Sequence, residues 1–283
     1  MFSSLFGSSE GENGKEEKSC MSVEGGQIQK ILEEMSTSEK KALKEFSKLA
    51  AEKKYKAGEN HPMDTVTFVR FLVANKFNIK KATSQLEETL QFREETNPFK
   101  ITPKECPIAI RQGTWRFCGF SKTGACVIKI LAECWRPGEY TVDEHQNVFL
   151  YYMEQALHQT KDNYQFICLF DMHDWSLQHT SMRMIYRMAS LLQKYYPERL
   201  FKAFLVNTPF LFNATWKAIK GVLDARTVSK VQFLSEDEAK DVLLQYIPKE
   251  TLEKKYGGEH EPYKSYAELH PEKSQDSKSS SKN

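Results

Sequence analysis

Residues 195–212 read YYPERLFKAFLVNTPFLF, and this stretch decides the fold. Its middle part, residues 200–206, is a nearly continuous apolar run, which is typical of a strand buried on both faces of a sheet. A similar run covers residues 164–170, and a shorter one covers residues 230–234. The first two runs are separated by residues 179–195, whose apolar side chains have helical spacing. Buried strands that alternate with helices predict a parallel sheet covered by helices on both faces.

The segments before these strands predict a hairpin and a helical N-terminal part. Residues 115–120 and 125–131 are short apolar runs on either side of a turn, which is the pattern of two antiparallel strands. Residues 28–95 carry apolar residues at helical spacing, and Asp64 and Asn78 are typical N-cap residues. The predicted fold class is therefore α/β, with a helical N-terminal subdomain plus a mixed, mainly parallel sheet flanked by helices.

Composition divides the chain into four parts. We predict a disordered acidic tail over residues 1–26, an N-terminal helical subdomain over 27–98, a sheet domain over 99–258 and a flexible C-terminal tail over 259–283. The formal net charge of +2 is too small to indicate nucleic-acid binding. Both tails are net acidic, so the basic charge lies in the body of the chain, which favours an anionic membrane surface or a phosphate-bearing ligand.

Several other classes of protein are excluded by pattern. The longest apolar stretches are much shorter than the ~18–20 residues that a membrane-spanning helix needs. The N-terminus lacks the basic and apolar regions of a secretory signal. The six cysteines form no Cys-x-x-Cys pair, and we expect reduced thiols in a cytoplasmic protein.

No enzyme signature is present. The sequence has neither a Gly-x-Ser-x-Gly elbow nor a His or Cys cluster with zinc spacing. Asp171, His173 and Asp174 follow a predicted strand, where they either form a strand-to-helix turn or bind a metal or act as a base and its orienter. We favour the turn, and we expect a protein that is not an enzyme and that uses no cofactor or metal.

Four ordered motifs carry a family resemblance. The chain resembles the CRAL-TRIO (Sec14-like) lipid-transfer family, of the phosphatidylinositol transfer type, in residues 70–78, 195–210, 223–230 and 247–258. The resemblance implies that the sheet encloses a lipid pocket and that residues 209–223 form a mobile gate helix. It also implies an activity without covalent chemistry, in which one phospholipid is extracted from a bilayer and exchanged.

The resemblance also assigns site residues. The lipid headgroup is expected at four positions, which are Lys76, Glu198, Thr227 and Lys230. Two ammonium groups and a hydroxyl suit a phosphodiester, and a carboxylate orients a lysine or accepts from inositol hydroxyls. Apolar side chains are expected to form the pocket and the gate, namely Phe166, Cys168, Phe204, Val206, Phe210, Phe212, Trp216 and Ile219. Asn75 stands where some members of the family have an arginine, so one cationic contact is absent.

The predicted partners are phosphatidylinositol and a second lipid. Members that bind phosphatidylcholine use small hydroxyl residues and a tyrosine where this chain has Phe166, Cys168 and Ile128, so we expect a second lipid other than phosphatidylcholine. A sterol or another apolar ligand remains open. An alternative function is a regulator that senses phosphatidylinositol and presents it to a lipid kinase or other partner without net transport. We expect a monomer that contacts membrane surfaces transiently and does not bind nucleic acid.

Overall fold

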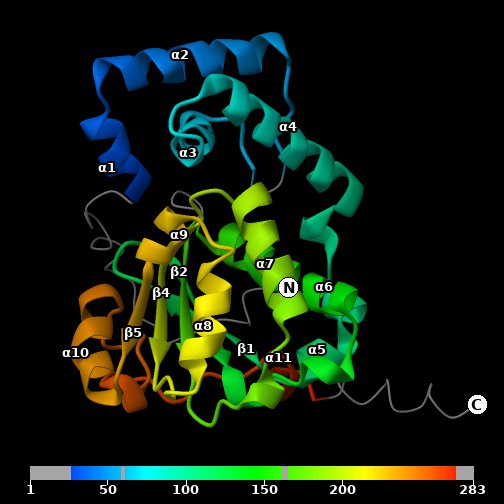
Figure 1. The fold of residues 1–283 in the computed structure, drawn as a ribbon, viewed down its shortest axis with the longest axis vertical. Coiled ribbons are helices and arrows are strands. Elements are labelled where there is room, and N and C mark those ends of the chain that lie inside the picture. Colours follow the sequence, from blue (N-terminus) through cyan, green and yellow to red (C-terminus); the bar gives the residue numbers. More distant parts are fainter. Residues whose placement is uncertain (1–26, 59–60, 161–164, 272–283) are drawn as a thin grey trace, which may run out of the picture.

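Five strands form one sheet in the order β1-β2-β3-β4-β5 (Figure 1). The computed structural model describes residues 27–58, 61–160 and 165–271. β1 is antiparallel to β2, and the other neighbours are parallel, as the hairpin and the buried apolar runs predict. The strand bounds are β1 Trp115–Phe120, β2 Cys126–Leu131, β3 Phe166–Asp171, β4 Leu200–Val206 and β5 Val231–Leu234. The mixed, mainly parallel α/β architecture is confirmed.

The N-terminal helices pack as a separate layer at one end of the sheet (Figure 1). Their bounds are α1 Gln27–Glu34, α2 Thr37–Glu52, α3 Thr65–Ala74 and α4 Ile79–Thr96. The carboxylate of Asp64 and the amide oxygen of Asn78 accept hydrogen bonds from the first turns of α3 and α4, so both predicted caps are present. Phe46, Phe71 and Leu86 lie at the centre of their shared core. The expected acidic tail, residues 1–26, lies outside the described residues.

The two faces of the sheet carry different helices. One face packs against helices that follow β2, β3 and β4 in the chain, and the other packs against the helix after β5 and the C-terminal segment. The bounds of the helices from residue 107 onward are α5 Pro107–Arg111, α6 Val142–Gln159, α7 Met182–Tyr195, α8 Phe212–Lys220, α9 Ala225–Ser229, α10 Glu236–Tyr246 and α11 Tyr266–Leu269. Among the described residues, no helix combines the length and hydrophobicity that crossing a bilayer requires.

Phe204 and Val206 lie on the α10 face of the sheet, which corrects their expected place in the pocket. Both are fully buried against Ala239 and Leu243 of α10. Successive side chains of a strand point to opposite faces, so Ala203 rather than Phe204 faces α6 and α7. An apolar strand with two buried faces lacks the alternation that would have revealed this from sequence.

The C-terminal segment is packed from residue 259 to residue 271, where the sequence predicted a flexible tail. The backbone N–H of Tyr263 donates to Glu253 Oε1, 2.9 Å away, and the guanidinium of Arg116 on β1 donates to Tyr263 O at 2.9 Å. Ser265 forms a capping box that starts α11. Residues 272–283, the rest of the expected tail, lie outside the described residues.

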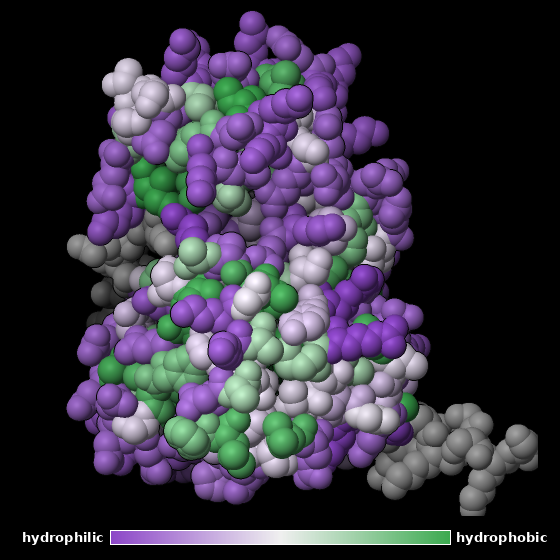
Figure 2. All heavy atoms as spheres, in the orientation of Figure 1, coloured by the Kyte–Doolittle hydropathy of each residue, from purple (hydrophilic) through white to green (hydrophobic). Residues whose placement is uncertain are grey.

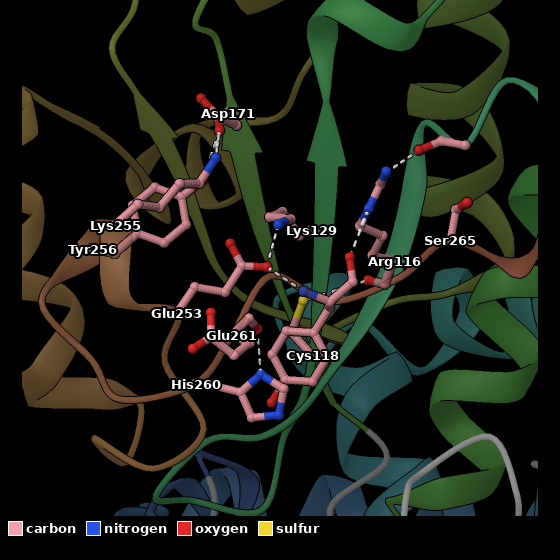
Figure 3. A network of polar contacts seen from close by, with 12 residues as sticks. Arg116, Cys118, Lys129, Asp171, Glu253, Lys255, Tyr256, His260, Glu261 and Ser265 are labelled. Atoms are coloured by element: carbon pink, nitrogen blue, oxygen red, sulfur yellow. Dashed lines mark hydrogen bonds and ion pairs between the residues drawn. The ribbon is translucent and has the colours of Figure 1, made fainter. Parts of the chain in front are cut away.

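Two buried carboxylates attach residues 253–256, which lead into this segment, to the sheet (Figure 3). Lys129 of β2 forms an ion pair with Glu253, and both side chains are almost completely inaccessible to solvent. Asp171, the last residue of β3, accepts hydrogen bonds from Lys255 and from the hydroxyl of Tyr256, the latter at 2.8 Å. Charged groups therefore hold residues 253–256 on a face of the sheet that is otherwise mainly apolar.

A buried polar group also joins the N-terminal helices to the sheet domain. Arg93 of α4 donates two hydrogen bonds to Glu154 of α6, at 2.8 and 3.0 Å. The hydroxyl of Tyr196, which follows α7, donates to the same carboxylate at 2.7 Å. Bidentate arginine–carboxylate pairs fix orientation strongly, so this group sets how α4 lies against α6 and α7.

The packing difference between Phe204 and Phe210 predicts different effects on stability. Phe204 is fully buried, and Phe210 is 86% exposed. We expect Phe204→Ala to lower the free energy of unfolding by about 3–5 kcal/mol, because it leaves a cavity in a packed core. Phe210→Ala should change it by less than about 0.5 kcal/mol. Urea denaturation measures both values, and a loss below about 1 kcal/mol for Phe204→Ala would contradict its placement in a solid core.

Asp171 predicts a pH-dependent contribution to stability. Burial alone raises the pKa of its carboxyl. The hydrogen bond and charge of Lys255, together with the hydrogen bonds from Tyr256 and the N–H of His173, lower the pKa by more than burial raises it, so the pKa lies below the ordinary 3.8. A depressed carboxyl pKa stabilises the fold above the unfolded-state pKa, and this contribution is lost as pH falls through the folded pKa.

Asp171→Asn should therefore lower the free energy of unfolding by about 1–3 kcal/mol near neutral pH. The difference from the wild-type protein should shrink when the pH is lowered from 7 to well below 3.8, because the wild-type carboxylate becomes protonated as the pH falls through its lowered pKa. Urea denaturation at both pH values measures the difference. An equal loss at the two pH values would contradict the account.

Candidate functional site

An apolar cavity of about 240 Å³ lies between the sheet and its α6–α8 layer. Its floor comes from β1 to β5, and its walls come from α6, α7 and α8. The apolar lining residues include Trp115, Ile130, Phe166, Cys168, Phe170, Ala203, Leu205 and Val231 from the sheet and Phe149, Met153, Ile185, Met188, Ala189, Leu192, Phe212, Trp216 and Ile219 from the helices. Five of the predicted pocket and gate residues, Phe166, Cys168, Phe212, Trp216 and Ile219, line this cavity.

Small side chains at the centre of the floor leave the space open. Cys168 of β3 pairs in register with Ala203 of β4, so two short side chains lie side by side facing the helices. On the opposite face the next pair in register is Leu169 with Phe204, which fills the core against α10. Burial raises the pKa of the Cys168 thiol to about 12, so this thiol stays neutral and behaves as a small apolar group.

Helix α8 closes the cavity with aromatic contacts from its first residue and from its middle. The ring of Phe212 meets Trp175 edge to face, with centroids 5.0 Å apart, and Trp216 meets Phe233 at 5.2 Å. The helix is shorter than the predicted segment 209–223, because it begins at Phe212 and ends at Lys220. These contacts are apolar and few, so the helix is held to the domain by side-chain packing that a competing apolar ligand could replace.

Large apolar side chains are exposed just before α8. Phe210 is 86% exposed and Leu211 is 73% exposed, and Leu177 near the start of α7 is 67% exposed. In Figure 2, apolar side chains gather over the lower part of the molecule, where α8 lies in Figure 1, whereas the face over α1 to α4 is mainly polar. Phe210 does not line the cavity, and its exposed ring makes the surface just before α8 apolar.

Three of the four predicted headgroup residues lie together at the amino end of β4 and β5. Lys230 Nζ donates to Glu198 Oε2 at 2.9 Å, and Thr227 lies one helical turn before Lys230 on α9. Burial lowers the pKa of Lys230, and the carboxylate of Glu198 opposes that shift. Lys76 is exposed in the turn after α3, and no hydrogen bond or ion pair within the described ranges joins it to the other three. The headgroup role of the four residues remains a prediction.

Two further residues complete this cluster, and the sequence analysis missed both. Arg226 Nε donates to Glu198 Oε1 at 2.6 Å, so Glu198 holds two cations. Asp224 caps α9 and accepts a hydrogen bond from the Thr227 hydroxyl at 2.6 Å. The Thr227 oxygen is therefore left to accept hydrogen bonds. The signal for Asp224 was the Asp-x-x-Thr capping pattern at 224–227, whereas nothing local indicates that Arg226 reaches back to Glu198.

The Asp171–Asp174 motif does not assemble into a catalytic arrangement. The carboxylate of Asp171 is buried toward Lys255 and Tyr256, on the α10 side of the sheet. His173 Nδ1 lies 2.9 Å from Asp174 Oδ2, and both side chains are exposed. Within the described residues, Glu133 is the third potential ligand beside them, and it is exposed as well. A solvated group of this kind fits the strand-to-helix turn.

The positions that bear on phosphatidylcholine are apolar in three dimensions as well as in sequence. Phe166 and Cys168 line the cavity, and Ile128 is completely buried in the adjoining core beside α6. A choline phosphate at this place would lie against aromatic, thiol and aliphatic groups. The arrangement offers no strong hydrogen-bond donor at these three positions.

Comparison with known proteins places these observations in a family. The family model for the CRAL/TRIO domain matches residues 111–258, and that for the CRAL/TRIO N-terminal domain matches residues 27–88. The SEC14 cytosolic factor of Eremothecium gossypii is 28% identical over 244 residues, which cover 80% of this chain and 78% of that protein. The SEC14 cytosolic factor of Kluyveromyces lactis is 48% identical over a shorter stretch of 69 residues, which is 24% of this chain and 23% of that protein.

A solved structure has the same fold. The crystal structure of Sfh5 superposes with a TM-score of 0.64 and covers 82% of this chain and 91% of that one. The two chains share 20% sequence identity, so the likeness concerns the architecture alone.

Proposed function

We propose, because this chain belongs to the CRAL/TRIO domain family, that it binds one phospholipid and carries it between membranes, with phosphatidylinositol as the preferred ligand. Lipid binding and transfer are the activity that this family implies. The choice of phosphatidylinositol, its exchange for a second lipid and the contact with a membrane surface are the finer parts of the proposal. We place the protein in the cytoplasm, with peripheral association to membranes.

One observation carries the proposal. Thr227 lines the apolar cavity and also belongs to α9, which holds Arg226 and ends at Lys230 beside Glu198. A cluster of charged and hydroxyl groups therefore adjoins a cavity with apolar walls. This is the arrangement that an amphiphile with an anionic head and apolar chains requires.

Two cations of the cluster are placed to bind a phosphodiester. Arg226 and Lys230 share the carboxylate of Glu198, whereas the second carboxylate of the cluster, Asp224, accepts from the Thr227 hydroxyl. Burial already disfavours the charged form of Lys230, and a bound phosphate would offset that cost with charge-assisted hydrogen bonds. The exposed ammonium of Lys76 would reach the headgroup from the N-terminal domain. Inositol hydroxyls are donors, which the Thr227 oxygen can accept.

The cavity must widen to enclose a phospholipid. Its 240 Å³ lies below the ~300–1,000 Å³ of pockets that enclose drug-sized ligands, so two acyl chains do not fit in this conformation. Exposing two chains of common length to water costs on the order of 20 kcal/mol at about 0.8 kcal/mol per methylene, so a carrier must enclose both chains. Outward movement of α8 supplies the volume, because its contacts with Trp175 and Phe233 are apolar.

The second lipid is proposed to be other than phosphatidylcholine. The cavity presents Phe166 and Cys168 where members that bind phosphatidylcholine use hydroxyl side chains. An uncompensated choline phosphate would lose its hydration without gaining hydrogen bonds there.

The headgroup assignment predicts a loss of inositol-lipid binding in a double variant. Lys76→Ala combined with Lys230→Met should lower the affinity for phosphatidylinositol by about 10- to 100-fold, because each ammonium supplies a charge-assisted hydrogen bond. The affinity is measured by incubating the full chain with vesicles that contain radiolabelled phosphatidylinositol and counting the lipid that stays with the protein. Methionine at 230 keeps the apolar stem of the buried lysine.

Lys48→Ala is the matched control, because Lys48 is exposed on α2, outside the cluster. It should bind phosphatidylinositol like the wild-type protein. Undiminished binding by the double variant would contradict the headgroup assignment. Binding by the wild-type protein without transfer between vesicles would favour the regulator that presents its lipid to a partner.

The exposed segment before α8 predicts a defect in transfer. Phe210→Glu combined with Leu211→Glu should slow phosphatidylinositol transfer between vesicles by about tenfold or more, because two charges replace the apolar surface that enters the bilayer interface. Stability in urea should stay close to that of the wild-type protein. Leu269→Glu is the control, because Leu269 is also exposed but lies on α11. Equal transfer rates for all three proteins would rule out this surface as the membrane contact.

A further inference from the structure

A buried histidine lies in the wall of the apolar cavity. His145 is in the first turns of α6, is 4% exposed and is one of the residues that line the cavity. The indole of Trp135, which also lines the cavity, stacks on its ring at 5.3 Å between centroids. A polar ring in such a wall is costly unless both of its nitrogens find partners.

The hydrogen bonds around His145 fix its tautomer. Trp135 Nε1–H is only a donor, and it donates to the hydroxyl oxygen of Tyr140 at 2.8 Å. The Tyr140 hydroxyl lies 3.1 Å from His145 Nδ1, and its own proton is therefore available for that nitrogen. Burial raises the pKa of Tyr140 and lowers the pKa of His145 to about 4, so both groups are neutral near pH 7. His145 thus accepts at Nδ1 and carries its proton on Nε2.

The Nε2–H of His145 is a donor without an acceptor in the described parts of the chain. Its ring makes one hydrogen bond there, through Nδ1. Other polar groups of the lining are engaged, since His179 Nδ1 accepts from Ser176 N and Thr180 accepts from Trp175. Thr114, which also lines the cavity, has a buried hydroxyl oxygen that makes no hydrogen bond.

This polar spot is at the opposite end of the cavity from the charged cluster. Thr114 lies just before β1, and Trp135 lies just after the carboxyl end of β2. Thr227 and Lys230 instead lie at the amino ends of β4 and β5. β2 and β3 have six residues each, and at about 3.3 Å per residue the two ends are roughly 17 Å apart. An oxygen anchored at His145 is therefore too far from the phosphate cluster to contact it.

We propose that the cavity also takes a neutral, apolar lipid whose one oxygen function, a hydroxyl or a carbonyl, accepts a hydrogen bond from His145 Nε2–H. The inference rests on the proposed function, because the ligand occupies the same cavity and is a candidate for the exchanged second lipid. An ionised carboxylate would lose its hydration in this wall for a single neutral donor, so a neutral oxygen is favoured. An apolar body suits the aromatic and aliphatic lining.

The test uses a pair of probes that differ by one hydroxyl. The full chain is incubated with vesicles that contain hexadecanol and hexadecane with different radiolabels, the vesicles are sedimented, and the ratio of the two probes on the protein is measured. Comparing variants at one vesicle composition cancels the different partitioning of the probes. His145→Asn keeps an amide near the Nδ1 position, where Tyr140 is satisfied, and removes Nε2. His145→Gln places an amide nitrogen near the Nε2 position.

We expect His145→Asn to lower the ratio of hexadecanol to hexadecane by about tenfold, because the buried donor is lost. His145→Gln should keep the ratio within about threefold of the wild-type value. Tyr140→Phe leaves the histidine in place but removes the hydroxyl that donates to Nδ1, so the proton of His145 is no longer kept on Nε2. This variant should lower the ratio by about threefold, and it replaces His145→Asn in the test if that variant does not fold. An unchanged ratio in whichever of His145→Asn and Tyr140→Phe folds would overturn the inference.

The same vesicles with phosphatidylinositol separate this inference from the proposed function. Binding of phosphatidylinositol together with a ratio that His145 does not affect would refute the inference alone. A ratio that depends on His145 in a protein that binds no phosphatidylinositol would refute the headgroup proposal alone. A wild-type protein that takes up neither probe would refute the inference.

Discussion

The structure depends on the different packing of the two faces of β3 and β4. Each strand places successive side chains on opposite faces, so one face carries Leu169 and Phe204 into a solid core under α10. The other face carries Cys168 and Ala203, which pair in register and leave space beneath α7 and α8. A register shift of one residue would move the large side chains into the cavity. The cavity therefore follows from the strand register, which places small side chains on this face of the sheet.

Much of the fold could be predicted because its signals are local. Continuous apolar runs, a hairpin turn and capping residues such as Asp64 and Asn78 each indicate one element, and the structure confirms them. Local signals could not predict which side chains of β4 face the cavity and which face α10, since a strand buried on both sides has no polar alternation. The clue was size, because Ala203 is the small residue of an otherwise bulky run and lies opposite the small Cys168.

The polar groups show where sequence reasoning stopped. Glu198 was predicted to orient a lysine, and it does contact Lys230, but its second cation, Arg226, comes from a helix whose direction only the tertiary structure sets. The packed residues 259–271 were missed because Arg116, which donates to Tyr263 O, lies more than a hundred residues earlier. His145 carries no sequence signal either, since its partners Trp135 and Tyr140 come from the irregular segment between β2 and α6. Ion pairs between distant segments leave no local pattern.

The central claim is that this chain encloses one whole lipid in a cavity that opens by movement of α8. Native mass spectrometry of the full chain, after incubation with phosphatidylinositol vesicles and their removal, measures this directly. The account predicts a mass increase of one phosphatidylinositol per chain, which disappears when the protein is denatured. A protein that keeps its unliganded mass under these conditions would contradict the account, and so would one that binds several lipids weakly.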